Sequence, residues 1–418
     1  MRILYSIGIH CYALGVRLAA PFNSKARLMV KGWKETFGRL SMSSVGKGNT
    51  AWFHASSLGE FEQARPVLEQ FRRENPGYQI CVTFFSPSGY EVRKNYPEAD
   101  FICYLPMDTR KNARRFVNLL RPSVVFFVKY DFWFNYLEQL RLREIPTVIF
   151  SSIFRPDQYF FKFYGQWFLK QLGLCFTHIF VQNEESVQLL KSHGITQVSI
   201  AGDTRFDRVH AIAQESCRFT IIEDFLEHHK GSKVLLAGSS WEPDEANLKK
   251  YFDHRHHDLL LVLAPHVTSE SHINYILNLF GKENCSRYSQ LDKANPNSRI
   301  LIIDTIGILA SLYRYAYVAY IGGGFGRGIH NILEAITFGK PVVFGPNYQK
   351  FKEAKDIISL GGGYSYQQYE QLQRTLDALL DDEAYYLKSS KVCTQYLNQN
   401  LGSAEIILST ISKYINKA

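Results

Sequence analysis

The sequence has few cysteines for a chain of 418 residues, and no two of its seven lie in a C-x-x-C spacing. Their odd number and scattered positions argue against a disulfide framework and against a zinc knuckle. No cluster has metal-ligand spacing, and the run H-R-H-H at 254–257 is expected to be solvated in a polar connection. The sequence therefore predicts a protein of the reducing cytosol with no metal and no cofactor.

The N-terminus lacks an apolar run long enough to cross a membrane. Segment 1–22 is apolar, but His10 and Arg17 interrupt it, and a spanning helix needs about 20 apolar residues. A small-residue cleavage site is also missing, which argues against a secretory signal. Basic residues follow at 25, 27, 31 and 34. This pattern is typical of an interfacial anchor on an anionic leaflet, and a helix packed on the domain surface is the alternative.

Low-complexity tracts and short repeats are absent, and the composition is that of a globular protein, with 46% hydrophobic and 21% charged residues. The formal net charge is +9, which predicts an acidic partner. Nucleic acid, a phosphorylated lipid and an anionic membrane surface fit this charge equally well.

Short apolar runs alternate with amphipathic stretches from residue 49 onward, which predicts parallel sheets covered on both faces. The expected strands are 50–55, 79–85, 100–105, 123–129, 147–151 and 178–181, then 233–237, 259–264, 299–304, 316–321 and 341–344, and expected helices include 62–74, 111–120 and 134–144. An irregular stretch at 207–232 separates two sets. We expect an α/β fold of two open sheets, with ligands at the carboxyl ends of the strands and in a cleft between the sheets.

The stretch H-A-S-S-L-G-E at 54–60 follows the first expected strand, where such folds bind ligands. Gly59 permits close approach, and a carboxylate at Glu60 is suited to act as a general base on a hydroxyl. The alternative is that Glu60 only stabilises the positive end of the following helix.

A glycine-rich loop at 322–328 follows a later strand, with five glycines in seven positions. Such a loop lets backbone amides approach a phosphate, and a following helix adds favourable charge. The loop is not G-x-G-x-x-G and lacks the Walker lysine, so neither dehydrogenase nor P-loop chemistry is indicated. His330 is placed to donate to a phosphate and Glu334 to hold ribose hydroxyls. A purely structural turn is the alternative.

Other candidates are weaker. Ser239 and His266 lie at strand ends where a nucleotide is expected, and Arg205 is placed to reach a phosphate across the cleft. The aromatic-basic stretches 129–136 and 154–170 suit a phosphorylated, acylated surface, but they also suit base stacking or ordinary helix packing.

Several motifs in order resemble the 3-deoxy-D-manno-oct-2-ulosonic acid (Kdo) transferases of lipopolysaccharide synthesis. They are H-A-S-S-L-G-E at 54–60, Q-N-E-E at 182–185, G-D-T-R-F-D at 202–207, G-G-x-x-R-G-x-H-N-x-L-E-A at 323–335 and G-K-P-V-V-F-G-P at 339–346. The resemblance covers nearly the whole chain. It implies a GT-B fold, CMP-Kdo as donor, a lipid A precursor as acceptor, and inversion without a metal at the cytoplasmic face of the inner membrane.

The resemblance also implies roles for residues. Glu60 matches the proposed general base, and Arg205 matches a basic position that faces donor or acceptor charge. The implied donor-binding residues are Gly323, Gly324, Arg327, Gly328, His330, Asn331, Glu334, Ser239 and His266, and the implied acceptor-binding residues are Ser57, Gly59, Lys129 and Asp131. We expect a membrane-associating segment at 1–40, an acceptor-binding domain at 41–208, a donor-binding domain at 209–400, and a helix at 401–418 that packs back on the acceptor-binding domain.

One segment departs from the family pattern. Many relatives carry E-x-E-L-W-P-N where this chain has K-Y-D-F-W-F-N at 129–135, so the acceptor is expected to differ in phosphorylation or acylation. One alternative is a nucleotide-sugar epimerase, which would not need the N-terminal anchor. Another is a GT-B enzyme that acts on a different acceptor. A nucleic-acid-binding module without catalysis is a third, and the resemblance argues against a nucleic-acid partner.

Overall fold

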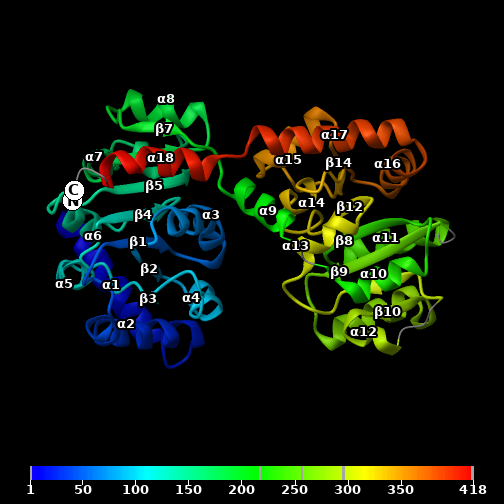
Figure 1. Ribbon diagram of the computed structural model, residues 1–418, viewed down its shortest axis with the longest axis horizontal. Coiled ribbons are helices and arrows are strands. Elements are labelled where there is room, and N and C mark those ends of the chain that lie inside the picture. Colours follow the sequence, from blue (N-terminus) through cyan, green and yellow to red (C-terminus); the bar gives the residue numbers. More distant parts are fainter. Residues whose placement is uncertain (1, 216–217, 256–257, 294–296, 416–418) are drawn as a thin grey trace. The chain divides into compact units, whose positions relative to one another are not determined.

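The computed structural model describes residues 2–215, 218–255, 258–293 and 297–415. The chain divides into two compact units: unit 1 comprises Met1–Arg208 and Leu401–Ala418, and unit 2 comprises Val209–Asn400. Each unit contains a parallel seven-stranded sheet among its described residues (Figure 1). The predicted α/β class with two parallel sheets is therefore confirmed.

Unit 1 alternates strands and helices along most of its length. Its elements are α1 (Arg2–Ala19), α2 (Ser24–Met42), β1 (Thr50–Ala55), α3 (Leu58–Glu74), β2 (Gln79–Phe84), α4 (Pro87–Arg93), β3 (Phe101–Tyr104), α5 (Arg110–Leu120), β4 (Val124–Val128), α6 (Phe134–Arg141), β5 (Thr147–Ser152), η1 (Tyr159–Phe161), α7 (Gln166–Cys175), β6 (His178–Val181), α8 (Glu184–Ser192), β7 (Val198–Ile200) and α18 (Ser403–Ile415). Helix α9 (Arg205–Gln214) crosses the boundary to unit 2.

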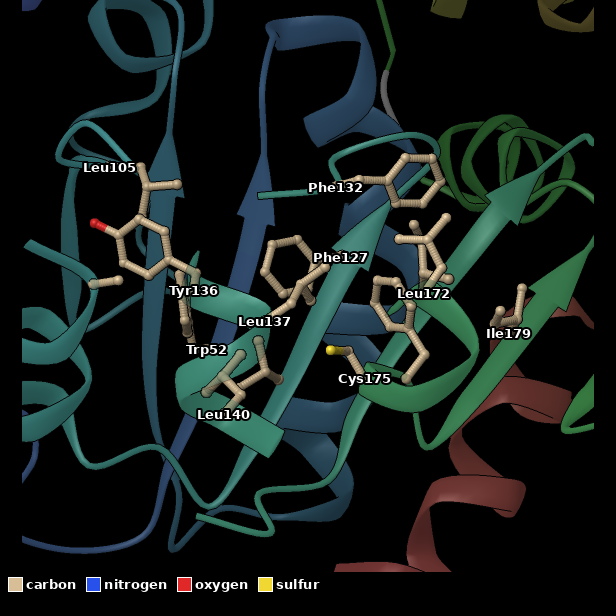
Figure 2. Packing of buried hydrophobic residues seen from close by; sticks show 14 of the residues in the cluster. Trp52, Leu105, Phe127, Phe132, Tyr136, Leu137, Leu140, Leu172, Cys175 and Ile179 are labelled. Atoms are coloured by element: carbon tan, nitrogen blue, oxygen red, sulfur yellow. The ribbon is translucent and has the colours of Figure 1, made fainter. Parts of the chain in front are cut away.

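The sheet of unit 1 has the strand order β3-β2-β1-β4-β5-β6-β7, and it is buried on both faces. Neighbouring residues of a strand point to opposite faces, so Trp52 belongs to the apolar cluster that includes residues of α5, α6 and α7, while Phe53 belongs to the cluster that includes residues of α3 and α18. Figure 2 shows Trp52 and Phe127 against Tyr136 and Leu140 of α6. Full burial of each such side chain contributes about 1.5–3 kcal/mol relative to exposure, which explains why the strands read as continuous apolar runs.

The C-terminal helix α18 belongs to unit 1 although it follows all of unit 2 in sequence. Its Ile407 and Ile411 are fully buried in the cluster that contains Phe61 of α3. The carboxylate of Asp207 accepts hydrogen bonds of 2.8 Å from the amides of Gly402 and Ala404. These amides lie at the start of α18, where a helix has no acceptors of its own, so Asp207 holds the returning helix in place.

Unit 2 repeats the same architecture with the strand order β10-β11-β9-β8-β12-β13-β14. Its elements are α10 (Thr220–Glu227), β8 (Lys233–Ser240), α11 (Glu242–Arg255), β9 (Leu259–Pro265), α12 (Glu270–Phe280), η2 (Lys282–Asn284), β10 (Cys285–Arg287), η3 (Tyr288–Lys293), β11 (Ile300–Ile302), α13 (Leu309–Leu312), η4 (Tyr313–Tyr315), β12 (Val318–Ile321), α14 (Leu333–Ile336), β13 (Val342–Phe344), α15 (Lys352–Leu360), β14 (Gly363–Ser365), α16 (Tyr369–Asp381) and α17 (Glu383–Gln399).

Some elements differ from the sequence-based expectation. The stretch 207–232, expected to be irregular, holds most of α9 and all of α10. Strands β7, β10 and β14 were not predicted, because each has three residues and too short an apolar run to be recognised. His254 and Arg255 end helix α11 rather than lying in a connection, whereas His256 and His257 fall outside the described residues.

Helix α1 lies on unit 1 but leaves much of its apolar surface exposed. Ile3, Leu4, Leu14 and Leu18 are 76%, 65%, 55% and 67% exposed, and Ala13 is buried. Among the described helices, none is by itself long and apolar enough to span a bilayer; α1 and α2 together satisfy the length and composition criteria, with a bend of 118° between them.

Asp207→Ala is expected to lower the free energy of unfolding by about 1–2 kcal/mol, because two amides at the start of α18 lose their acceptor. Urea denaturation followed by circular dichroism measures this. Asp157→Ala is the control, since the Asp157 side chain is 80% exposed and its loss should change stability by less than about 0.5 kcal/mol. Equal effects of the two substitutions would contradict the role of Asp207.

Candidate active site

The strand order of each sheet reverses at one place, and ligands of open α/β sheets bind at the carboxyl ends of the strands there. In unit 1 the reversal lies between β1 and β4, which are neighbours in the sheet. The loops that follow these strands carry Ser56 and Ser57 on one side and the segment 129–133 on the other. In unit 2 the reversal lies between β8 and β12. Ser239 lies at the end of β8, and the glycine-rich loop follows β12.

Glu60 lies in the first turn of α3 and forms a reciprocal cap with Ser57. Its Oε2 accepts a hydrogen bond of 3.0 Å from the Ser57 amide, and the Ser57 hydroxyl accepts one of 3.4 Å from the Glu60 amide. The capping alternative is therefore realised in the geometry. Among the described residues no donor within hydrogen-bond geometry is found for Oε1 of Glu60, and a Cβ added at Gly59 would meet no atom within 4 Å. A substrate group can thus approach Glu60 over Gly59.

Asp131 links the two loops at the reversal point of unit 1. Its carboxylate accepts hydrogen bonds from the Ser56 hydroxyl and, at 3.0 Å, from the Ser56 amide. Asp131 is 8% exposed, so this acidic side chain is built into the site rather than presented to solvent. Asp131 and Ser57, both implied by the resemblance as acceptor-binding residues, therefore lie on two loops that Asp131 joins through Ser56.

His54 is a buried neutral residue of the same network. The indole Nε1 of Trp133 donates to Nε2 of His54 at 3.0 Å, and because an indole only donates, Nε2 must be unprotonated. The proton then lies on Nδ1, 2.8 Å from the Thr83 hydroxyl. Burial lowers the pKa of His54 to about 3, in agreement with a neutral ring. His54 therefore orients Trp133 and forms no ion pair with Asp131.

Charges in this site act on one another. Burial raises the pKa of Glu60, and the nearby positive charge of Lys129 partly opposes that rise. Burial also raises the pKa of Asp131, and the negative charge of Glu60 raises it further. Lys129 is held in a left-handed backbone conformation, φ 57°, by hydrogen bonds of its amide and carbonyl to the neighbouring strand β5. The charge of Lys129 thus favours the ionised form of Glu60, and the charge of Glu60 favours the protonated form of Asp131.

Arg205 is engaged within its own unit. Its Nε and Nη2 lie 2.8 and 2.7 Å from Oδ2 of Asp203, and its amide donates to Oδ1. Asp203 also accepts from Gln63 of α3 at 3.1 Å. The arginine side chain is 34% exposed.

The glycine-rich loop of unit 2 needs glycine for packing. A Cβ at Gly322 would lie 2.2 Å from the carbonyl oxygen of Ser239, and one at Gly324 would lie 2.6 Å from the backbone of Gly345. Gly323 has φ 91°, and Ser239 has φ 55°. By contrast, a Cβ at Gly326 would meet its nearest atom at 3.6 Å. The structural alternative therefore accounts for part of this loop.

Asp244 fixes the same loop and was not singled out in the sequence. Its buried carboxylate accepts hydrogen bonds from the Gly323 amide, the Trp241 amide and the Tyr320 hydroxyl, at 2.9, 3.0 and 2.7 Å. The Gly323 amide is consequently occupied and is not available to a phosphate. In the sequence, the run E-P-D-E at 242–245 indicates only acidic residues in the first turn of a helix behind a strand.

His330 and His266 meet at the strand ends of unit 2. Their rings are 4.6 Å apart, and His266 stacks on Trp241 at 4.5 Å. Burial, and secondarily His266, lowers the pKa of His330, so the ring is neutral and offers one N–H. Ser239 lies half-buried at the end of β8, and Arg327 is exposed on the loop.

Glu334 is placed differently from the expectation. The expected helix after the loop, α14, has only four residues and ends before Gly339, which has φ 67°. A helix this short adds little dipole to the loop. Asn331 Nδ2 donates to Oε1 of Glu334 at 3.2 Å, which holds the carboxylate at the half-buried edge of the site.

No group of three or more residues that could hold a metal ion is found in the described parts of the chain. Arg255 of the H-R-H-H run is instead ion-paired with Asp258, Asp377 and Asp381.

Known proteins resemble both a part of unit 1 and the chain as a whole. Residues 31–208 match the family model described as 3-deoxy-D-manno-octulosonic-acid transferase (kdotransferase). The chain is 24% identical over 397 residues to the 3-deoxy-D-manno-octulosonic acid transferase of Haemophilus influenzae, covering 92% of this chain and 91% of that protein. It is 28% identical over 384 residues to that of Chlamydia pneumoniae, covering 85% and 84%. The chain is a relative of the Kdo transferases. These homologues indicate that it is a glycosyltransferase.

Solved structures agree with the fold expected for Kdo transferases. The UDP-GlcNAc 2-epimerase of Neisseria meningitidis, solved with UDP-GlcNAc, superimposes with a TM-score of 0.62 and 15% identity, covering 87% of this chain and 100% of that chain. Identity this low shows the fold alone. With its two parallel sheets, the fold is GT-B.

Gly324→Ala is expected to lower the free energy of unfolding by about 1–3 kcal/mol, because its Cβ would overlap the backbone of Gly345. Gly326→Ala is the matched control in the same loop and should change stability by less than about 0.5 kcal/mol. Thermal and urea unfolding measure both. A tolerated Gly324→Ala would contradict the close approach of the two segments.

Proposed function

We propose that the chain transfers Kdo from CMP-Kdo to a lipid A precursor of the lipid IVA type, in lipopolysaccharide synthesis. The observation that carries the proposal is the position of Glu60. It lies half-buried at the strand-order reversal of unit 1, inside the region that matches the kdotransferase model. Its uncapped carboxylate oxygen is suited to take a proton from a bound hydroxyl.

On the acceptor side, Glu60 acts as the general base. The acceptor hydroxyl approaches over Gly59, and its oxygen attacks the anomeric carbon as its proton passes to Glu60. Lys129 favours the ionised form of Glu60, while Asp131 beneath it is biased toward the protonated form. One base suffices for a single displacement with inversion, so no second nucleophilic carboxylate is needed.

On the donor side, unit 2 stabilises the departing CMP. Negative charge develops on its phosphate, and groups fixed in advance near that charge lower the barrier. His330 offers an N–H and Arg327 a positive charge, while Asn331 and Glu334 are assigned to the ribose hydroxyls. In this proposal the protein groups alone meet the phosphate charge, without a metal or cofactor.

We place the reaction at the cytoplasmic face of the inner membrane. The exposed apolar residues of α1, with the basic residues of α2 behind them, support binding to an anionic lipid surface. An acceptor that is itself a membrane lipid requires such a location.

Glu60→Gln is expected to lower kcat by about 10²- to 10⁴-fold, because the general base is lost while the fold remains. The assay follows labelled Kdo from CMP-Kdo to tetraacylated lipid A precursor, with the donor generated in place. Glu74→Gln, an exposed change on the same helix, is the control and should retain full activity. Full activity of Glu60→Gln would refute the base assignment, and no Kdo transfer by the unaltered protein would refute the proposed function.

The pH profile is expected to depend on Lys129. Since Glu60 must be ionised and burial raises its pKa, kcat/KM should fall as pH falls through a value above that of an exposed glutamate. Lys129→Gln removes the charge that opposes this rise, so the acid limb should move to higher pH. Measured pH profiles of kcat/KM test the direction. An acid limb at the same pH in Lys129→Gln and in the unaltered protein would contradict the charge interaction between Lys129 and Glu60.

A further inference from the structure

A cavity of about 490 Å³ opens in unit 1 beside the proposed acceptor site. Helix α1 contributes Leu4, Tyr5 and Ile9 to its wall, and the segment around η1 and α7 contributes Tyr159, Trp167 and Phe168. The lining is thus dominated by aromatic and aliphatic side chains. Among its lining residues that the structure describes, Asp131 is the sole charged one.

The cavity shares two wall residues with the loops beside Glu60. Asp131 and Trp133 line it, and the same two residues bind Ser56 and His54 at the carboxyl end of β1. A ligand lying in the cavity therefore reaches the loops at the strand-order reversal. None of the described lining residues is a cation, so a phosphate finds no counter-charge there.

The wall formed by α1 is firmly attached to the unit. The Tyr5 hydroxyl donates to Oδ2 of the buried Asp108 at 2.6 Å and accepts from the Phe134 amide at 3.2 Å. Arg2 forms an ion pair with Glu138 of α6. Tyr5 also stacks on Phe168, with ring centroids 6.4 Å apart. Helix α1 is thus part of a built cavity as well as an exposed apolar surface.

We propose that this cavity holds one acyl chain of the acceptor lipid, with α1 as one of its walls. The inference rests on the proposed function, since it assigns a place to part of that acceptor. Outside the cavity, α1 continues with exposed apolar residues such as Ile3 and Leu18, so a chain leaving a bilayer remains in apolar contact until it enters. Chain binding in the cavity would hold the sugar headgroup near Glu60.

The first test measures chain binding without any donor. Alkyl glucosides of increasing chain length, below their micelle-forming concentrations, are titrated into the full-length protein by calorimetry. Each added methylene should tighten Kd by about fourfold until the chain fills the cavity. Affinity that does not depend on chain length would overturn the inference.

A matched pair of variants tests whether the alkyl chain binds in this cavity. Leu4→Trp fills the cavity from an exposed wall position and should weaken binding of the longest glucoside at least about tenfold. Leu14→Trp lies on the same helix, is similarly exposed and does not line the cavity, so its Kd should be unchanged. An equal response of the two variants would overturn the inference.

The second test separates the inference from the proposed function. Leu4→Trp should raise KM for tetraacylated acceptor and leave kcat unchanged, and it should not alter kcat/KM for the deacylated acceptor. Kdo transfer with the same KM in Leu4→Trp and Leu14→Trp would overturn the acyl-chain site and leave the proposed function standing. Chain-length-dependent binding that only Leu4→Trp weakens, without any Kdo transfer, would refute the proposed function while supporting the cavity as a chain site.

Discussion

Burial of one aspartate at the strand-order reversal is the constraint on which each unit depends. In unit 1 Asp131, from the loop after β4, binds the backbone and hydroxyl of Ser56, from the loop after β1. In unit 2 Asp244, from the helix after β8, binds the amide of Gly323, from the loop after β12. A buried carboxylate is costly unless donors surround it, so each of these aspartates forces two loops into one arrangement. The candidate residues are presented on those loops.

This constraint separates the groups that hold the site from those that can act on a ligand. Asp131 and Asp244 are buried and accept two and three hydrogen bonds, and both ring nitrogens of the neutral His54 are engaged. Glu60 differs, since one of its oxygens caps α3 and the other has no donor among the residues that the structure describes. Capping and catalysis are therefore compatible in Glu60: the cap fixes the carboxylate in one rotamer, and a fixed base loses less entropy when it meets its substrate.

The sequence was sufficient for the parallel sheets because strands buried on both faces, such as 124–128, are continuously apolar. It also indicated which residues follow the central strands. It failed for three-residue edge strands, and it did not show how short α14 is, which ends before Gly339 with its left-handed backbone conformation. Asp244 was missed because a buried acid and an exposed first-turn acid look alike in a sequence, and only tertiary packing of Tyr320 and Gly323 distinguishes them.

Helix α1 shows why a linear pattern underestimates an N-terminal segment. Read as a sequence, its apolar residues indicate either an anchor or a packed surface helix, as if the two excluded each other. In the structure the exposed and the packed residues lie on different sides of the same helix. Leu14 and Leu18 remain exposed, while the Tyr5 hydroxyl donates a hydrogen bond to Asp108. Asp108 also accepts from the amides of Asn135 and Tyr136 at the start of α6, directly after the loop that carries Asp131. The position of α1 is thus set by the same backbone segment that follows the loop of Asp131. A displacement of α1 would therefore also move that loop.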